Sequence, residues 1–301
     1  MRVLWMIAGI LVVVQGANCV YAQLPVLEKQ EALPAGQLVR EVIYNELHDH
    51  QTHGAWRYFI ERQSAAGTQV EEQVETADGP LSMVMQSNGR ALSAEEESEE
   101  ETRLERLLNS PSEQARHLRQ YDEDEERIGR ILALLPDAFV YEYDGDENGC
   151  YRLRFQPNPE YLAASIEARI FHAMSGTLWV DARGKRLARL DGRVSENVDF
   201  GFGILGRLYK GGWFRLVRVQ VSATDWKTAS LEIHMNVRAL LVKTFAKDTN
   251  ERRGGFVAVP AGMSLAQGLE VLNGCEEMAE GRSRKSQRRA APATASLAMR
   301  P

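Results

Sequence analysis

The alternation of apolar and polar residues with a period of two is the dominant pattern in this chain. Tyr151, Leu153 and Phe155 alternate with arginines, and every odd position from 231 to 237 is apolar. This spacing puts one set of side chains on one face of a β-strand. Further runs rich in β-branched and aromatic residues occur at 56–62, 70–76, 81–86, 139–143, 176–181, 186–194, 213–221, 240–245 and 255–259. The pattern predicts about eleven strands.

Helical spacing interrupts the strands at several places. Residues 36–47 repeat apolar positions three and four apart, and 264–272 predict a closing helix. Ser93 and Glu96 form a capping box ahead of a glutamate-rich helix. A further helix is expected from Pro111 to about residue 135, ending before Pro136. Residues 93–135 are therefore expected to form an acidic helical insertion.

These elements predict an α+β fold built on one large, curved antiparallel sheet. Consecutive alternating strands are typical of antiparallel sheets with one apolar face, which helices can cover. We expect an incompletely closed half-barrel in a single domain spanning residues 23–275. Residues 276–301 contain few large apolar residues and are expected to be a disordered basic tail.

The first 22 residues have the pattern of a cleavable secretory signal peptide. Arg2 precedes the apolar run 3–14, and Val20-Tyr21-Ala22 provides a cleavage site. The apolar run is shorter than the roughly 20 residues that a spanning helix needs. The sequence thus predicts a soluble, exported protein of the periplasm.

Charge is unevenly distributed along the chain. The formal net charge is −6, but residues 281–301 carry six basic residues and no acid. Without this tail and Arg2, the chain has 29 basic and 42 acidic residues, which argues against a nucleic-acid partner. The basic tail could contact anionic lipid headgroups at a membrane surface, or it could be a solvated terminus.

Two cysteines, Cys150 and Cys275, remain after the predicted cleavage. An even number of cysteines in an oxidising compartment permits one disulfide, and two free thiols are the alternative. Neither cysteine has a nearby histidine that would indicate a catalytic thiol.

The segment from residue 200 to 214 alternates glycines with large apolar side chains. We expect it to line or gate an apolar cavity, with the alternative that it covers the sheet edge. Its candidate ligand-binding residues are Phe200, Phe202, Ile204, Leu205, Leu208 and Trp213. The match of residues 201–206 to G-x-G-x-x-G lacks a surrounding βαβ unit, so no dinucleotide or other cofactor is expected.

Other candidate sites have weaker patterns. His48, His50 and His53 could supply metal ligands for a metal-dependent enzyme, but their spacing matches no zinc motif and favours a solvated loop. The acidic runs 95–101 and 122–126 lack the spacing of a calcium loop, and 144–149 fits a hairpin turn better. With no hydrolase or P-loop motif, the sequence predicts no catalytic residue and no enzyme.

Two stretches carry a resemblance to a known group of proteins. The first runs from Trp56 to Thr76 and on to Asn88-Gly89 and Ser93; the second comprises 176–181, 186–192 and 206–212. In local sequence and in the order of predicted elements, residues 36–273 resemble the periplasmic lipoprotein-carrier superfamily, the LolA/LolB-like and RseB-like half-barrels.

The resemblance implies a concave apolar surface that binds acyl chains of lipids or lipoproteins, without catalysis, as a carrier or a sensor. It transfers no individual binding residue. The acidic insertion and the basic tail depart from the compact carriers, so an envelope protein-interaction or regulatory module using the acidic helices stays open as an alternative.

Overall fold

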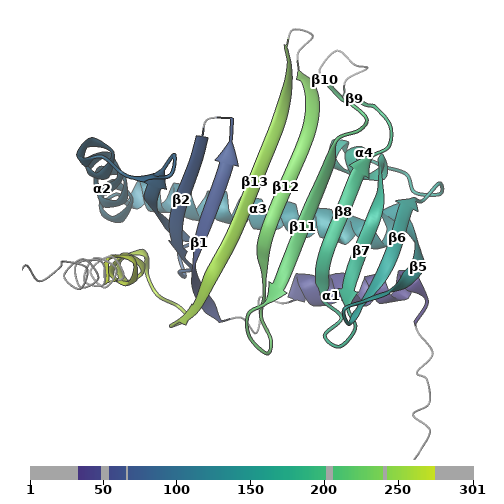
Figure 1. Ribbon diagram of the computed structural model, residues 1–301, viewed down its shortest axis with the longest axis horizontal. Coiled ribbons are helices and arrows are strands. Elements are labelled where there is room, and N and C mark those ends of the chain that lie inside the picture. Colours follow the sequence, from purple (N-terminus) through teal and green to yellow (C-terminus); the bar gives the residue numbers. More distant parts are fainter. Residues whose placement is uncertain (1–32, 49–53, 66, 201–205, 240–242, 275–301) are drawn as a thin grey trace, which may run out of the picture. The chain divides into compact units, whose positions relative to one another are not determined.

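A computed structural model describes residues 33–48, 54–65, 67–200, 206–239 and 243–274. The described residues after Leu33 group into one compact unit, whose strands belong to a single antiparallel sheet (Figure 1). None of the described helices is long and apolar enough to cross a membrane. The predicted signal peptide, residues 1–22, and the tail, 276–301, lie outside the described residues.

The sheet follows a path of eleven strands in the order β4-β3-β2-β1-β13-β12-β11-β8-β7-β6-β5, while two short strands, β9 and β10, lie off this path. The strands are β1 (Ala55–Ser64), β2 (Gly67–Val74), β3 (Leu81–Ser87), β4 (Arg90–Ala91), β5 (Phe139–Glu147), β6 (Cys150–Pro157), β7 (Met174–Asp181), β8 (Leu187–Val194), β9 (Val198–Phe200), β10 (Gly206–Leu208), β11 (Trp213–Gln220), β12 (Trp226–Ala239) and β13 (Lys243–Val259). The two ends of the path do not pair among the described residues, so the predicted open, antiparallel α+β fold is confirmed.

Four labelled helices and one further helix accompany the sheet. They are α1 (Ala35–His48), α2 (Ala94–Asn109), α3 (Pro111–Ala138), α4 (Ile166–His172) and residues 265–274. The expected capping box is present, because Glu96 N donates to Ser93 Oγ and Ser93 N donates to the Glu96 carboxylate. Ser110 then ends α2 and caps α3, with Pro111 in the first turn, where a missing N–H costs nothing.

The prediction that Pro136 lies beyond its helix is wrong, because α3 continues to Ala138. Its last carbonyls find donors outside the helix. Asn158 N donates to the Ala138 carbonyl and Asn158 Nδ2 to the Asp137 carbonyl, each at 2.9 Å. These bonds from outside the helix satisfy carbonyl groups that have no hydrogen-bond donor within α3.

Tight turns set the register of two hairpins. Asn148 and Gly149 both have positive φ, as do Asn88 and Gly89, and each pair connects two antiparallel strands directly. Two consecutive positive φ angles are characteristic of the type I′ turn, which Asn-Gly favours. The hairpin turn expected within 144–149 is therefore present. It consists of Asn148 and Gly149, because β5 continues to Glu147.

Helices pack on the sheet at two places. α1 contacts β5 and β8, and α3 contacts α1, α4 and β5; both helices lie behind the sheet in Figure 1. At the other end, α2 and helix 265–274 enclose a core around Val74, Leu81 and Met83 with Leu104 and Leu272.

The second half of the chain differs in part from the elements that the sequence predicts. The runs 240–245 and 255–259 were predicted as separate strands, but residues 243–259 form the single strand β13, which passes through Gly255 at φ +68°. Helix α4 was not predicted. Within the 200–214 segment, residues 206–208 form β10, which pairs with both β9 and β12.

Candidate functional site

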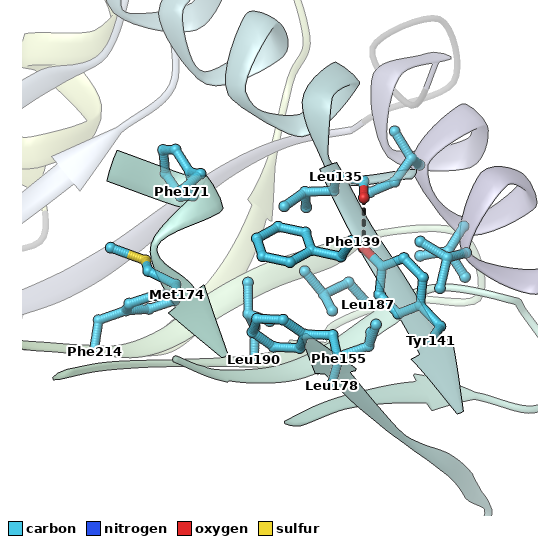
Figure 2. Close-up of a pocket in the computed structure, with 13 residues that line it drawn as sticks. Leu135, Phe139, Tyr141, Phe155, Phe171, Met174, Leu178, Leu187, Leu190 and Phe214 are labelled. Atoms are coloured by element: carbon cyan, nitrogen blue, oxygen red, sulfur yellow. Dashed lines mark hydrogen bonds between the residues drawn. The ribbon is translucent and has the colours of Figure 1, made fainter. Parts of the chain in front are cut away.

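An apolar pocket lies between the sheet and the helices α1, α3 and α4 (Figure 2). Its lining consists of Val39, Val42, Ile43, Leu135, Phe139, Tyr141, Phe155, Phe171, Met174, Leu178, Leu187, Leu190 and Phe214. Apart from the phenol of Tyr141, none of these side chains carries a strongly polar group. Such a lining is typical of sites that bind hydrophobic ligands.

Strand register builds the floor of the pocket. Leu178 of β7 lies opposite Leu153 of β6 and Leu190 of β8, and directly paired residues of antiparallel strands share a face. Phe139 and Phe155 meet edge to face, with ring centroids 4.9 Å apart. The period-two pattern of the sequence thus becomes one continuous apolar surface.

Glycines on neighbouring strands make room for two of the aromatic rings. A Cβ on Gly176 would lie 2.9 Å from Phe155 Cζ and 1.9 Å from the Asp191 carbonyl oxygen. A Cβ on Gly192 would lie 2.2 Å from the Phe214 ring. All three distances are below van der Waals contact, so glycine at these positions lets the rings approach the strand backbone closely.

The roof of the pocket comes from three helices. Val39, Val42 and Ile43 present the apolar face of α1, Leu135 lies near the end of α3, and Phe171 belongs to α4. In Figure 2, Leu135 faces Phe155 and Leu190 across the pocket.

The phenol of Tyr141 is the polar group of the lining, and it is already bonded. Its hydroxyl donates to the Leu135 carbonyl at 2.6 Å (Figure 2). Burial raises the pKa of Tyr141 well above its ordinary value, and the nearby Asp137 adds to the shift. The group therefore stays neutral, and it joins the end of α3 to strand β5.

The free volume of the pocket is small. The space open to the centre of a water molecule is about 20 Å³, which is room for about one water. Pockets that hold small-molecule ligands usually measure roughly 300–1,000 Å³. The described conformation is thus closed, and an apolar ligand would have to separate the roof from the floor.

A buried cluster of charges holds α1 against the sheet. Glu46 accepts from Arg186 Nε at 3.1 Å, Arg186 Nη2 at 3.2 Å and the Leu187 amide at 2.9 Å, and it also pairs with Arg218. The side chains of Glu46, Arg186 and Arg218 are only 5%, 9% and 14% exposed. This cluster fixes the C-terminal half of α1 to β8 and β11.

Of the candidate ligand residues from the sequence, the described side chains of Leu208 and Trp213 are not among those that line this pocket. Phe202, Ile204 and Leu205 lie outside the described residues, and Phe200 ends β9. Leu208 is buried with Ala173, Met174, Val194 and Val198. Trp213 stacks on His234, their ring centroids 6.3 Å apart, in a separate surface hollow.

The other candidate residues are also placed only in part. His48 ends α1, where its Nδ1 lies 2.8 Å from the Tyr44 carbonyl oxygen, while His50 and His53 lie outside the described residues. Among the residues that the structure describes, no three His, Cys, Asp or Glu side chains form a metal-binding group. Cys150 has no disulfide partner in this part of the chain, and Cys275 lies outside it.

Sequence reasoning found the apolar face of α1 and the alternating strands but did not join them into a pocket. Phe171 lies on α4, which was not predicted, and Leu135 was assigned only to an acidic helix. Glycines within predicted strands could have indicated the pocket, because Gly176 is paired with Phe155 and Gly192 with Phe214 on the neighbouring strands.

No protein-family model matches the chain, and no curated protein matches it. Among solved structures, the chain is similar to a DUF1329 family protein from Desulfovibrio piger. The two are 12% identical with a TM-score of 0.31, and the match covers 77% of this chain and 95% of that one.

Proposed function

We propose that this protein is an exported, non-enzymatic carrier or sensor that binds an acyl chain of a lipid or lipoprotein in the apolar pocket. The observation that carries the proposal is the lining: thirteen side chains from the sheet and three helices, with the Tyr141 hydroxyl already bonded. A saturated chain offers no hydrogen-bonding groups, so it needs such a surface. Apolar area removed from water contributes roughly 25 cal/mol per Å² to its binding.

The closed state of the pocket determines how binding occurs. Leu135 of α3 and Val39 in the N-terminal half of α1 move away from the sheet, and the acyl chain takes the place of their contacts with it. Because apolar side chains then exchange one apolar neighbour for another, opening costs little once the ligand is present. The empty pocket closes because exposed apolar surface is unfavourable in water.

The first experiment looks for a ligand. Protein purified from the envelope fraction is examined by native mass spectrometry, and titration with a fluorescent fatty acid measures affinity. We expect copurified lipid or saturable binding of the fatty acid, together with an increase in Tm when the fatty acid is added, because a ligand of the native state stabilises it. Absence of both copurified lipid and saturable binding would exclude the proposal.

A matched pair of variants locates the site. Leu135→Glu introduces a charge into the roof, whereas Ile128→Glu changes a residue on the same helix that is 52% exposed. We expect at least about tenfold weaker binding for Leu135→Glu, since burying an unpaired carboxylate opposes ligand entry, and unchanged binding for Ile128→Glu. Equal affinities in the two variants would place the ligand elsewhere.

A further inference from the structure

A second hollow, with a different chemical character, lies between α2, the β3–β4 edge and helix 265–274. Its volume is about 550 Å³. Met83, Met85, Leu104 and Leu269 contribute apolar side chains to it. Methionine adapts its shape easily, and methionine-rich surfaces suit segments that have no fixed structure of their own.

One rim of this groove is a row of carboxylates. Glu97, Glu101 and Glu105 are spaced four residues apart on α2, so they lie on the same face of the helix, and all three line the groove and are exposed. Within the described part of the chain, none of the three forms an ion pair. Their neighbours differ in this respect, since Glu96 pairs with Arg90 and Glu100 with Arg103.

Three like charges at this spacing oppose helix formation. The same arrangement attracts a positively charged segment, and binding such a segment would remove the repulsion. An apolar floor beside an acidic rim therefore suits a basic segment that also has small or apolar side chains.

The chain itself supplies a segment of this kind. Residues 282–289 contain Arg282, Arg284, Lys285, Arg288 and Arg289, and no acid occurs from 281 to 301. This segment begins nine residues after Asn273, which lines the groove. Nine residues of extended chain reach about 30 Å, whereas the rim from Glu97 to Glu105 is only about 12 Å long.

We propose that this acidic groove, defined by Glu97, Glu101, Glu105 and the apolar residues beside them, binds residues 282–289 of the same chain. The short connection gives the segment an effective concentration of the order of millimolar, so weak charge pairs suffice. The contacts are exposed and become weaker as salt rises. A basic peptide from another protein binds this groove only by displacing the tail.

Distance measurement between two spin labels tests this proposal in the full chain. The labels are attached at Ser98→Cys on α2 and Ser286→Cys in the tail, with the native cysteines replaced by serine. We expect one short, narrow distance peak in low salt, and loss of that peak in 0.5 M sodium chloride. Dilution with unlabelled protein leaves the peak unchanged if the contact is within one chain.

Two sets of substitutions provide the comparison. Glu97→Gln, Glu101→Gln and Glu105→Gln together remove the rim charges, and we expect them to abolish the peak. The control set, Asp122→Asn, Glu123→Gln and Glu126→Gln, removes the same charge from an exposed part of α3 and leaves the peak unchanged. Circular dichroism confirms that both variants keep their helices.

Three results would overturn the proposal. A broad distance distribution in the unmodified groove would show that the tail does not bind it. Equal loss of the peak in both sets of variants would show that the contact depends on the net charge of the protein and not on the groove. Loss of the peak on dilution with unlabelled protein would assign the contact to a second copy.

Discussion

Replacing Glu46 by alanine tests whether buried charges hold α1 on the sheet. Glu46 is the shared partner of Arg186 and Arg218 and also accepts from the Leu187 amide. Because the carboxylate is 5% exposed and both arginines are largely buried, Glu46→Ala removes from the interior the anion that the two guanidinium groups share. Breaking a buried ion pair in this way costs about 3–5 kcal/mol.

That free energy predicts a measurable shift. In a domain of this size, 1 kcal/mol changes Tm by roughly 2–4 °C, so Glu46→Ala lowers Tm by about 6–20 °C. Urea denaturation gives the same quantity independently, as a lower midpoint with an unchanged slope. Glu46→Gln keeps an oxygen for the Leu187 amide, and we expect an intermediate loss.

Arg40→Ala is the matched control on the same helix. Arg40 pairs with Asp137 at 2.9 Å, but the two side chains are 61% and 66% exposed. A pair in water contributes at most about 1 kcal/mol. If Glu46→Ala and Arg40→Ala lowered stability equally, the buried cluster would not be what holds α1 in place.

Three further predictions concern the core, a close contact and a helix cap. Leu153 is fully buried, so Leu153→Ala lowers the free energy of unfolding by about 2–5 kcal/mol in urea, and a loss below about 1 kcal/mol would contradict its place in the core. Gly176→Ala puts a Cβ 1.9 Å from the Asp191 carbonyl oxygen, and we expect a loss of at least about 1 kcal/mol in thermal unfolding; unchanged stability would mean that the strands are not this close. Bonds from Arg90 and Ser93 lower the pKa of Glu96 to about 2; its stabilising contribution is complete above the ordinary value near 4.5 and is lost as the pH falls through about 2. An NMR titration of the Glu96 carboxyl that gave an ordinary pKa would refute this last prediction.

The alternation of apolar and polar residues was sufficient to predict most strands of the sheet. Leu153 and Phe155 alternate with arginines, and both are buried, as the period of two requires. The capping box at Ser93 marked the start of α2 to the residue. These features depend on interactions between near neighbours in the chain, which sequence displays directly.

What could not be predicted depends on distant residues. The end of α3 is set by Asn158, about twenty residues later, rather than by Pro136. Helix α4 has seven residues, too few to show a helical period. The pocket was missed for the same reason, because Val39 of α1 comes to line one pocket with Phe155 and Phe214 only after the strands have taken their order.

The pairing of β1 with β13 also affects how the molecule folds. It joins Ala55 to Val259, so the middle of the sheet is assembled from opposite ends of the chain. Contacts between such distant residues slow folding, since the long intervening chain must be ordered before they form. Until β13 has been synthesised, one edge of β1 has no partner, and an unpaired edge invites association with other chains. We therefore expect a slow final folding step and a need for protection from aggregation before it.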